Sequence, residues 1–471
     1  MDFKYCLEGK RYHTLNYDLT NRFKVRVFKV SLNGGFSCPN FKNGSGCIFC
    51  SAKGSGDFAG NKEDDLLTQF NTVKEKINKK WPDTKYIAYF QANTNTFAPV
   101  KILKEKFEQV IKFPNVVGLS IGTRPDAITS DCLDYLIDLN KRTYLTIELG
   151  LQSMHDDTLK LINRGHDLKC FDDCVKKLRK NKINVVVHII NGLPFENKEM
   201  MLNTIKHLNK LDIQGIKIHM LHILKNTKLE EFYNENKFHV LTKEEYVNIV
   251  CDQIELLDEK IVIHRLTGDA PKNELVEPVW TLKKVCVLND IDKELKKRQT
   301  YQGFSTNILN KVNLVCEKSI NSKDLVVDAT GQNINNTLKL CSLSKAVFCF
   351  NNRKNIIDYD KETFKKNNII IINDLYKNIK KDLNKYNEKI SLIIFNFNQL
   401  PKSNKTLVKS IKESFKLLNN KGKILIAYYK NNKGKKAFRK ILKHINKTNM
   451  NYNIYRNKNN ISAQFLIEII K

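Results

Sequence analysis

The sequence predicts an α/β protein of two domains: a partial barrel of six β/α units, (β/α)6, and then a Rossmann-like, doubly wound domain. Three observations predict it. Apolar runs typical of buried strands alternate with helical stretches along both halves of the chain. At 471 residues, the chain is too long for one hydrophobic core. The pattern is interrupted near Gln302-Gly303-Phe304, so we expect domains at 1–304 and 305–471.

Six apolar runs in the first domain are expected to form parallel strands, at 25–32, 86–90, 116–121, 144–149, 183–190 and 216–221. Helical stretches lie between them, for example at 130–140, 168–181 and 198–211. Repeated β/α units curve a parallel sheet into a full or partial barrel, whose active site gathers at the carboxyl ends of the strands. Functional residues are therefore expected just after each strand.

Three thiols, Cys38, Cys47 and Cys50, lie in a Gly-rich loop after the first strand. A structural zinc site uses four ligands, whereas a cubane iron–sulfur cluster held by three cysteinates keeps one iron free for a small molecule. The twelve cysteines follow no secretory signal, and no apolar run is long enough to span a bilayer. We therefore expect a cytoplasmic protein in which this cluster serves metal or redox chemistry.

Polar and turn residues follow the other strands too. They are Gln91 and Asn93 after the second strand, the segment 122–126 after the third, Gln152, Arg164 and Gly165 after the fourth, 191–194 after the fifth and His222 after the sixth. Their repeated position at strand ends predicts one shared site.

With these motifs, residues 5–305 resemble the radical S-adenosylmethionine (SAM) enzymes, and more closely the YhcC/MnmL-like branch related to the elongator catalytic subunit. The matching segments are 35–50, 89–99, 120–126, 148–153, 163–166, 192–194, 217–224 and 265–271. The resemblance implies a [4Fe-4S] cluster on Cys38, Cys47 and Cys50, whose free iron chelates SAM. It also implies a low-potential electron donor, such as flavodoxin or ferredoxin, and cleavage of SAM to a 5′-deoxyadenosyl radical. Eight residues separate the first two cysteines, where the common spacing is three.

The resemblance also implies roles for single residues. Gln152 and Arg164 would hold the amino-acid end of SAM, Glu148 or Arg124 its ribose, and Gly192 and Pro194 would let the backbone approach. The expected cofactor-binding set of this domain is Phe49, Thr123, Arg124, Glu148, Gln152, Arg164, His188, Gly192 and Pro194. Alternatively, Glu148 and Arg164 form a structural ion pair and 192–194 is only a turn.

Histidines are weaker candidates, because a histidine on a strand is more often a packed core residue. His222 is the candidate catalytic residue. His219 and His222 are three positions apart, so we expect them to face opposite sides of a strand, with at most one lining the barrel.

The net charge of +30 is unevenly spread: residues 306–471 hold 33 Lys and Arg against 11 Asp and Glu. A polyanion such as RNA would be attracted there. The alternative is that the abundant lysines form a solvated surface without a partner.

The second domain is expected to place strands at 325–328, 346–350, 369–372, 392–395 and 423–429, and a closing hairpin at 452–455 and 465–469. Asp328 closes the first strand before a turn into a helix, the nucleotide-binding arrangement of doubly wound folds. This half resembles the MnmM-like class I SAM-dependent tRNA methyltransferases. The expected SAM-site residues are Asp328, Thr330, Asn333, Asn351, Asn396 and Tyr429. Gln332, Ile334 and Asn351 depart from that family's pattern, which puts methyl transfer in question.

Together these resemblances imply an enzyme that converts carboxymethylaminomethyl to aminomethyl on the wobble uridine of tRNA. The second domain would methylate the product or only bind tRNA. The alternative is a radical SAM enzyme acting on a small metabolite, with the second domain a non-catalytic basic binding module.

Overall fold

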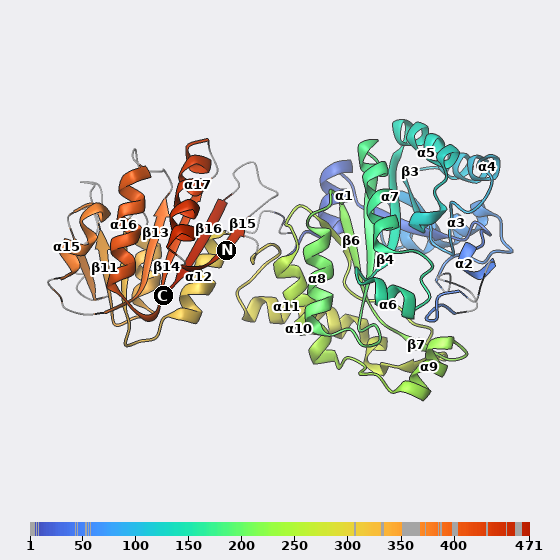
Figure 1. The fold of residues 1–471 in the computed structure, drawn as a ribbon. Coiled ribbons are helices and arrows are strands. Elements are labelled where there is room, and N and C mark those ends of the chain that lie inside the picture. Colours follow the sequence, from blue (N-terminus) through green and yellow to red (C-terminus); the bar gives the residue numbers. More distant parts are fainter. Residues whose placement is uncertain are drawn as a thin grey trace. The chain divides into compact units, whose positions relative to one another are not determined.

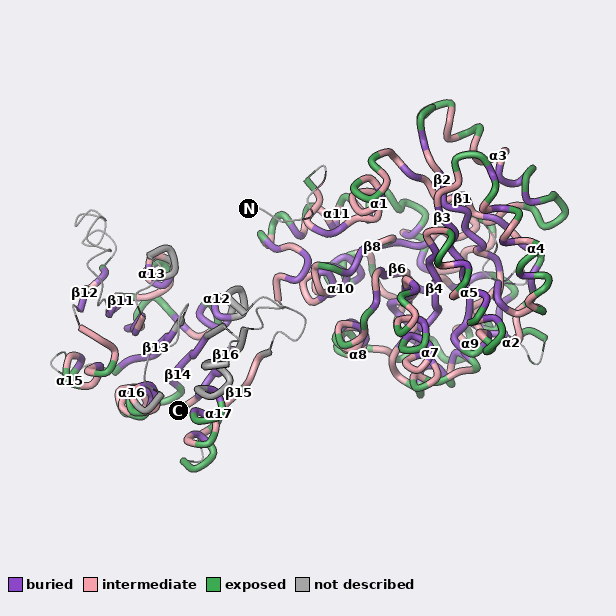
Figure 2. The backbone as a smooth tube through the Cα atoms, turned by 90° about the horizontal axis from the view of Figure 1, so that it is seen from above, coloured by how far each residue is buried: buried purple, intermediate pink, exposed green. Residues whose placement is uncertain are grey.

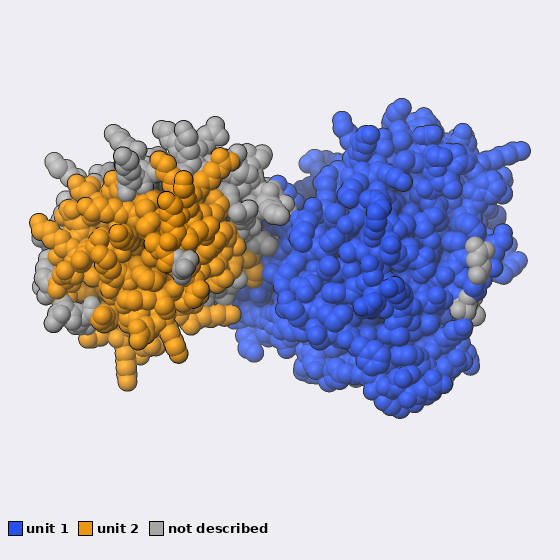
Figure 3. Space-filling model, in the orientation of Figure 1, with its two compact units in different colours: residues 1–303 blue, residues 304–471 orange. Residues whose placement is uncertain are grey.

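The structure is a computed structural model, and two compact units divide it, Met1–Gly303 and Phe304–Lys471 (Figure 3). It describes residues 5, 7, 9–42, 44, 46–51, 54, 56, 58–305, 308–330, 334–350, 368–372, 374–384, 386, 389–397, 404–429, 432–448, 450–456 and 464–471. Within these residues, no helix combines the length and the apolar character needed to cross a membrane.

Seven parallel strands form the curved sheet of the first unit, in the order β1-β2-β3-β4-β5-β6-β8. They are β1 (Val27–Leu32), β2 (Lys85–Phe90), β3 (Val116–Thr123), β4 (Tyr144–Gln152), β5 (Asn184–Asn191), β6 (Gly215–Met220) and β8 (Val262–Arg265). The six expected strands are all present, and β8 is a seventh that the sequence pattern did not reveal. The predicted α/β fold class, a partial barrel, is confirmed.

Helices cover the outer face of this sheet (Figure 1). They include α3 (Leu66–Asn78), α4 (Val100–Val110), α5 (Ser130–Arg142), α7 (Leu168–Lys180), α8 (Lys198–Leu208), α10 (Lys243–Leu256) and α11 (Lys284–Lys297). Side-chain caps start several of them: Thr129, Asp167 and Asn197 each accept a hydrogen bond from the backbone N–H three residues on. Helices and strands share one apolar core outside the barrel wall, where buried residues concentrate (Figure 2).

Side chains alternate along each strand, so every second residue points into the barrel. On β1, Val30 and Leu32 are fully buried in the outer core, which turns Lys29 and Ser31 inward. The same alternation turns Glu148 of β4 and Lys217 of β6 inward. The barrel interior is therefore polar in its middle layer.

A seven-stranded sheet also forms the second unit, in the order β12-β11-β10-β13-β14-β16-β15. Its strands are β10 (Leu325–Asp328), β11 (Ala346–Phe350), β12 (Ile369–Ile372), β13 (Ile390–Phe397), β14 (Leu418–Tyr429), β15 (Asn451–Arg456) and β16 (Gln464–Ile470). The first five in this order are parallel, and β16 and β15 close the sheet as the expected antiparallel hairpin.

Both faces of this sheet carry helices. Apolar residues of α12 (Ile308–Ser319) and α13 (Ile334–Cys341) pack on one face. Those of α15 (Ile379–Asn384), α16 (Asn404–Leu417) and α17 (Asn432–Lys447) pack on the other. This is the predicted Rossmann-like arrangement, and the strand order reverses between β10 and β13. Helix α17 was not predicted.

Candidate functional site

A cavity of about 930 Å³ opens inside the barrel of the first unit. Cys38, Cys47 and Cys50 all line it. Eight residues that were expected to bind SAM or to act in catalysis line it as well: Phe49, Thr123, Arg124, Glu148, Gln152, Arg164, His188 and His222. The fold thus brings together side chains from strands far apart in the sequence.

Gly192 and Pro194 are not among the residues that line this cavity. Gly192 has a φ of +83°, and its N–H faces the Met201 sulfur at 3.4 Å. It borders a separate small cavity beside Trp280. In the described structure, the 192–194 segment therefore forms a turn at the end of β5.

Hydrogen-bond donors surround the sulfur of Cys47. Asn40 Nδ2 lies 3.4 Å from it and also donates to the Asn163 carbonyl at 2.7 Å. Arg164 Nη1 lies 3.7 Å from the same sulfur. Donors of this kind stabilise thiolate ligands and tune iron–sulfur clusters. They fit a thiolate at Cys47.

The protonation of the cysteine pair agrees with this geometry. The hydrogen bond from Cys50, aided by Arg164 and Arg124 and opposed by burial, lowers the pKa of Cys47 to about 5. The same hydrogen bond raises the pKa of Cys50. Among the described residues, no three His, Cys, Asp or Glu side chains are placed to hold a single metal ion. The three thiols line one cavity, and they have the chemistry of ligands for a cubane cluster, which presents a different iron to each thiolate.

Two buried arginines brace the cysteine loop from β3 and from the segment after β4. Arg124 pairs with Asp126 through two hydrogen bonds of 2.9 and 2.8 Å, and donates to the Arg164 carbonyl at 2.7 Å. Arg164 donates to the Gly150 carbonyl at 2.7 Å, while its Nε is buried without a partner. Arg164 therefore keeps one donor that a bound cofactor could use.

Glu148 does not contact Arg164 through any hydrogen bond or ion pair of the described residues, so the alternative structural pair between them is absent.

Gly165 allows these arginines to sit close together. Its φ is +77°, and a Cβ there would lie 2.9 Å from both Arg124 Nη2 and Asn40 Oδ1. Only glycine adopts this conformation without strain and leaves this space. Thr123, at the end of β3, shares a 2.6 Å hydrogen bond with Thr96, which fixes the neighbouring loop.

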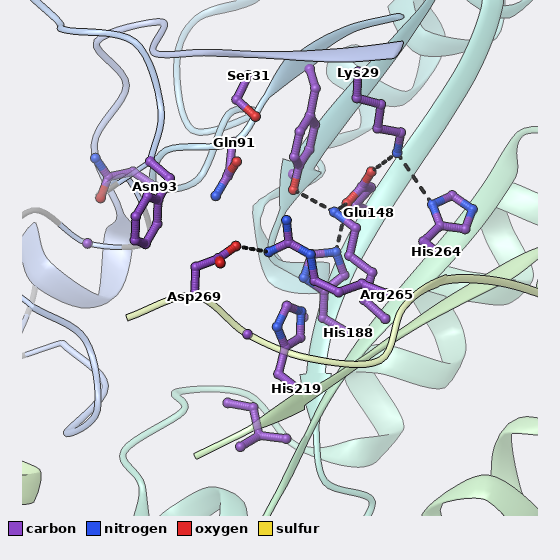
Figure 4. A pocket seen from close by; sticks show the side chains of 18 of the residues that line it. Lys29, Ser31, Gln91, Asn93, Glu148, His188, His219, His264, Arg265 and Asp269 are labelled. Carbon is purple, nitrogen blue, oxygen red and sulfur yellow. Dashed lines mark hydrogen bonds and ion pairs between the residues drawn. The ribbon is translucent and has the colours of Figure 1, made fainter. Parts of the chain in front are cut away.

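Deeper in the barrel, Glu148 has four polar neighbours, among them Lys29 and His188, which Figure 4 labels. Its Oε1 lies 2.5 Å from Lys29 Nζ and accepts from Ser120 Oγ at 2.6 Å. Its Oε2 lies 2.5 Å from Lys217 Nζ and 2.7 Å from His188 Nε2. Burial opposes ionisation of Glu148, but the charges of Lys217 and Lys29 outweigh it and hold its pKa well below the usual range.

Burial dominates at the other members of this network. It lowers the pKa of Lys217 to about 8 and that of His188 to about 4. It also keeps the pKa of His219 and His264 well below the usual value, so these rings are neutral at pH 7. Tyr89 completes the network, with its hydroxyl 3.2 Å from Lys217 Nζ.

Lys29, Lys217, Tyr89 and Arg265 were not predicted as site residues. A charged residue at an inward position of an apolar strand was the available signal for the two lysines. The expectation that at most one of His219 and His222 lines the barrel is wrong, because both line the cavity. Strand β6 ends at Met220, so the alternation does not extend to His222.

In the second unit, Asp328 ends β10 and is buried. It accepts from the N–H of Thr330 at 3.1 Å and from the Thr337 hydroxyl at 2.8 Å. These bonds join the end of β10 to Thr330 and to Thr337 of α13, at the point where the strand order reverses. Asn333 and Asn351 lie outside the described residues, as do the side chains of Asn396 and Tyr429.

Comparison with known families gives three matches. The family model "Radical SAM superfamily" matches residues 38–208, and "Radical_SAM C-terminal domain" matches residues 213–297. The model "Putative rRNA methylase" matches residues 347–471.

Individual proteins are similar to parts of the chain. "Uncharacterized protein YtqA" of Bacillus subtilis is 53% identical over 305 residues, which are 64% of this chain and 94% of that protein. A "tRNA uridine(34) acetyltransferase" of Methanocaldococcus infernus is 25% identical over 166 residues, 35% of this chain and 30% of that protein. A solved rRNA methylase of Streptococcus thermophilus is 22% identical, covers 35% of this chain and 96% of its own, and has a TM-score of 0.31.

The cysteine loop, the barrel around it and these matches lead to one assignment. The chain belongs to the radical SAM superfamily, in the group that includes YtqA, and carries a methyltransferase-like domain after the radical SAM domain.

Proposed function

We propose that this radical SAM enzyme acts on tRNA and converts the carboxymethylaminomethyl group of the wobble uridine to aminomethyl. The observation that carries the proposal is the cavity that encloses the three cysteines. Its volume of about 930 Å³ is at the upper end for ligand pockets, so it offers room for a cofactor and a nucleoside together. The similarity to a protein named for tRNA uridine 34 supports the choice of substrate.

Cys38, Cys47 and Cys50 would hold a [4Fe-4S] cluster, with Asn40 and Arg164 donating to the Cys47 sulfur. When bound, the cluster and SAM supply the radical that removes hydrogen from an unactivated carbon. Arg164 and Gln152 would orient the amino-acid end of SAM, because Arg164 keeps a free buried donor there. Phe49 and Thr123, which also line the cavity, would contact the rest of the cofactor.

Glu148 and Arg124 are poorer candidates for the SAM ribose than the sequence suggested. Both oxygens of Glu148 are engaged by Lys29, Ser120, His188 and Lys217. The Arg124 guanidinium is engaged by Asp126 and the Arg164 carbonyl. We assign both residues to positioning.

The second unit would bind tRNA through its basic surface. Its excess of 22 positive charges and its methyltransferase-like fold both support RNA as the partner. Methylation of the aminomethyl product is the second activity that this fold could carry. We favour binding without methyl transfer, because Gln332 and Asn351 depart from the residues expected around SAM.

Nucleoside mass spectrometry of tRNA from a strain lacking this protein tests the function. The deletion should accumulate carboxymethylaminomethyluridine at the wobble position and lose the derivatives that follow it. Complementation with the wild-type chain should restore them, and a Cys47→Ala chain should not. An unchanged wobble-uridine profile would overturn the proposal and favour a small-metabolite substrate.

A further inference from the structure

The buried network around Glu148 holds more positive than negative charge. Lys29 and Lys217 both lie 2.5 Å from this single carboxylate. The neighbouring histidines are neutral because burial lowers the pKa of His188 to about 4 and that of His264 well below its usual value. A closed structural cluster would be expected to balance its charges, because an uncompensated buried charge costs several kcal/mol. Among the described residues of this layer, the two lysines therefore exceed the carboxylates by one charge.

A further cation lies beside the network. Arg265 lines the same cavity, and its carboxylate partner Asp269, 3.5 Å away, is shared with Lys284 at 2.6 Å. Figure 4 shows the Arg265 side chain beside His188 and His219, with its end directed toward Asp269. Two carboxylates, Glu148 and Asp269, thus pair with four cations: Lys29 and Lys217 with the first, and Arg265 and Lys284 with the second.

Donors remain available on the cavity side. The Lys217 ammonium has three hydrogens and two neighbours, Glu148 and the Tyr89 hydroxyl at 3.2 Å. The Nε2 atom of His219 is also buried without a hydrogen-bond partner, and it donates in the tautomer that carries the proton there. Lys29, in contrast, has three neighbours, Glu148, Ser120 and His264. Lys217 is therefore the group with a hydrogen to spare, and Glu148 and Lys29 position it.

We propose that Lys217, assisted by Arg265 and positioned by Glu148 and Lys29, forms a subsite for a carboxylate of the substrate. This inference rests on the proposed function and extends it. The carboxymethylaminomethyl group ends in a carboxylate, and the aminomethyl product lacks it. A subsite that recognises this carboxylate would select the substrate and release the product.

The depth of the subsite distinguishes it from the cofactor end of the cavity. Lys29 precedes Leu32, the last residue of β1, by three positions, which is roughly 10 Å along a strand. The cysteine loop begins only beyond that end. SAM also carries a carboxylate, however, so the test must separate the two sources.

The test compares two tRNAs, one with carboxymethylaminomethyluridine and one with its methyl ester, using the reconstituted full chain. Wild-type protein should convert the free acid with a kcat/KM at least about tenfold higher than the ester. In Lys217→Met, the rate on the acid should fall to the level of the ester. Lys210→Met, an exposed lysine before β6, is the matched control and should keep the preference.

Each outcome identifies what failed. Conversion of neither tRNA by wild-type protein would refute the proposed function. Conversion of both at equal rates, or an acid preference that survives in Lys217→Met, would overturn the subsite alone. The comparison of the two tRNAs with wild-type protein uses no variant, so it tests the subsite even if Lys217→Met does not fold. A tenfold rise in the KM for SAM in tRNA-free release of 5′-deoxyadenosine by Lys217→Met would assign the lysine to the cofactor instead, and would also overturn it.

Discussion

Lys217 Nζ lies 2.5 Å from Oε2 of Glu148 inside the barrel, although the two residues are 69 positions apart in the sequence. Barrel interiors of this class are usually filled by branched apolar side chains. Here a buried ion cluster takes that place, so its stability and its chemistry depend on the same few contacts.

Glu148→Gln should lower the free energy of unfolding of the first unit by about 3 kcal/mol or more. The variant keeps the shape of the side chain but leaves Lys29 and Lys217 buried without a counter-charge. Urea unfolding followed by tryptophan fluorescence measures it in the full chain, because the two tryptophans, Trp81 and Trp280, both lie in this unit.

The matched control for Glu148 is Glu199→Gln. Glu199 forms a 2.7 Å ion pair with Lys206, but both side chains are substantially exposed, so the loss should stay within about 0.5 kcal/mol. Equal losses in the two variants would show that the Glu148 cluster is not a stabilising element.

Cys47→Ala should abolish the cluster. Wild-type protein reconstituted without oxygen is expected to bind about four irons per chain and to release 5′-deoxyadenosine with a reductant. The variant should lose both, because only two of the three thiolates remain. Cys286→Ala, which removes an exposed cysteine outside the cavity lining, is the control and should keep both. Full iron content in Cys47→Ala would refute the cluster assignment.

The sequence predicted the elements that depend on local pattern. Strands β10, β11 and β12 have the predicted bounds, because each is a short apolar run between polar turns. Helix α17 was missed although Phe438, Ile441 and Ile445 are buried at helical spacing, because lysines dominate its composition.

Most residues predicted at strand ends line the cavity, although Gly192 and Pro194 do not. Lys29 and Lys217, which lie inside the barrel, were missed. Lys29 and Glu148 are 119 residues apart, and no local pattern joins them. A charged residue at an inward position can be assigned to a buried network only when its partner is known. For the same reason, the sequence did not show that Lys29 and Lys217 pair with Glu148, the residue that was predicted to hold the SAM ribose.

Activity on the carboxylate substrate should fall above about pH 8. Burial lowers the pKa of Lys217 from 10.5 to about 8, so the ammonium is lost above that pH in the free enzyme. The charged and titratable groups that face it are Glu148, Lys29, Tyr89, His188, His219, His264 and Arg265. A profile of kcat/KM against pH should show the decline, and Lys217→Arg should remove it.

Unfolding cannot account for such a decline. Between pH 8 and 10.5 the unfolded chain binds more protons at this lysine than the folded chain, so this group makes the protein more stable as the pH rises. Tryptophan fluorescence at each pH checks that the fold persists. A decline that is unchanged in Lys217→Arg would assign the titration to another group.

The exposed face of α17 should contribute to tRNA binding. Arg439, Lys440 and Lys443 are exposed there, while Phe438 and Ile441 hold the helix to the sheet. Each phosphate contact releases counterions and adds roughly 0.7 to 0.9 to the slope of log affinity against log salt. Replacing the three cations by alanine should therefore reduce that slope by about 2, as measured by fluorescence anisotropy with labelled tRNA over a range of KCl concentrations.

The matched control replaces three exposed lysines of α7, Lys176, Lys177 and Lys180, and should change the slope less. Equal slopes for the two triple variants would show that α17 is not a specific tRNA surface, and the basic charge of the second unit would then act only as a diffuse attraction.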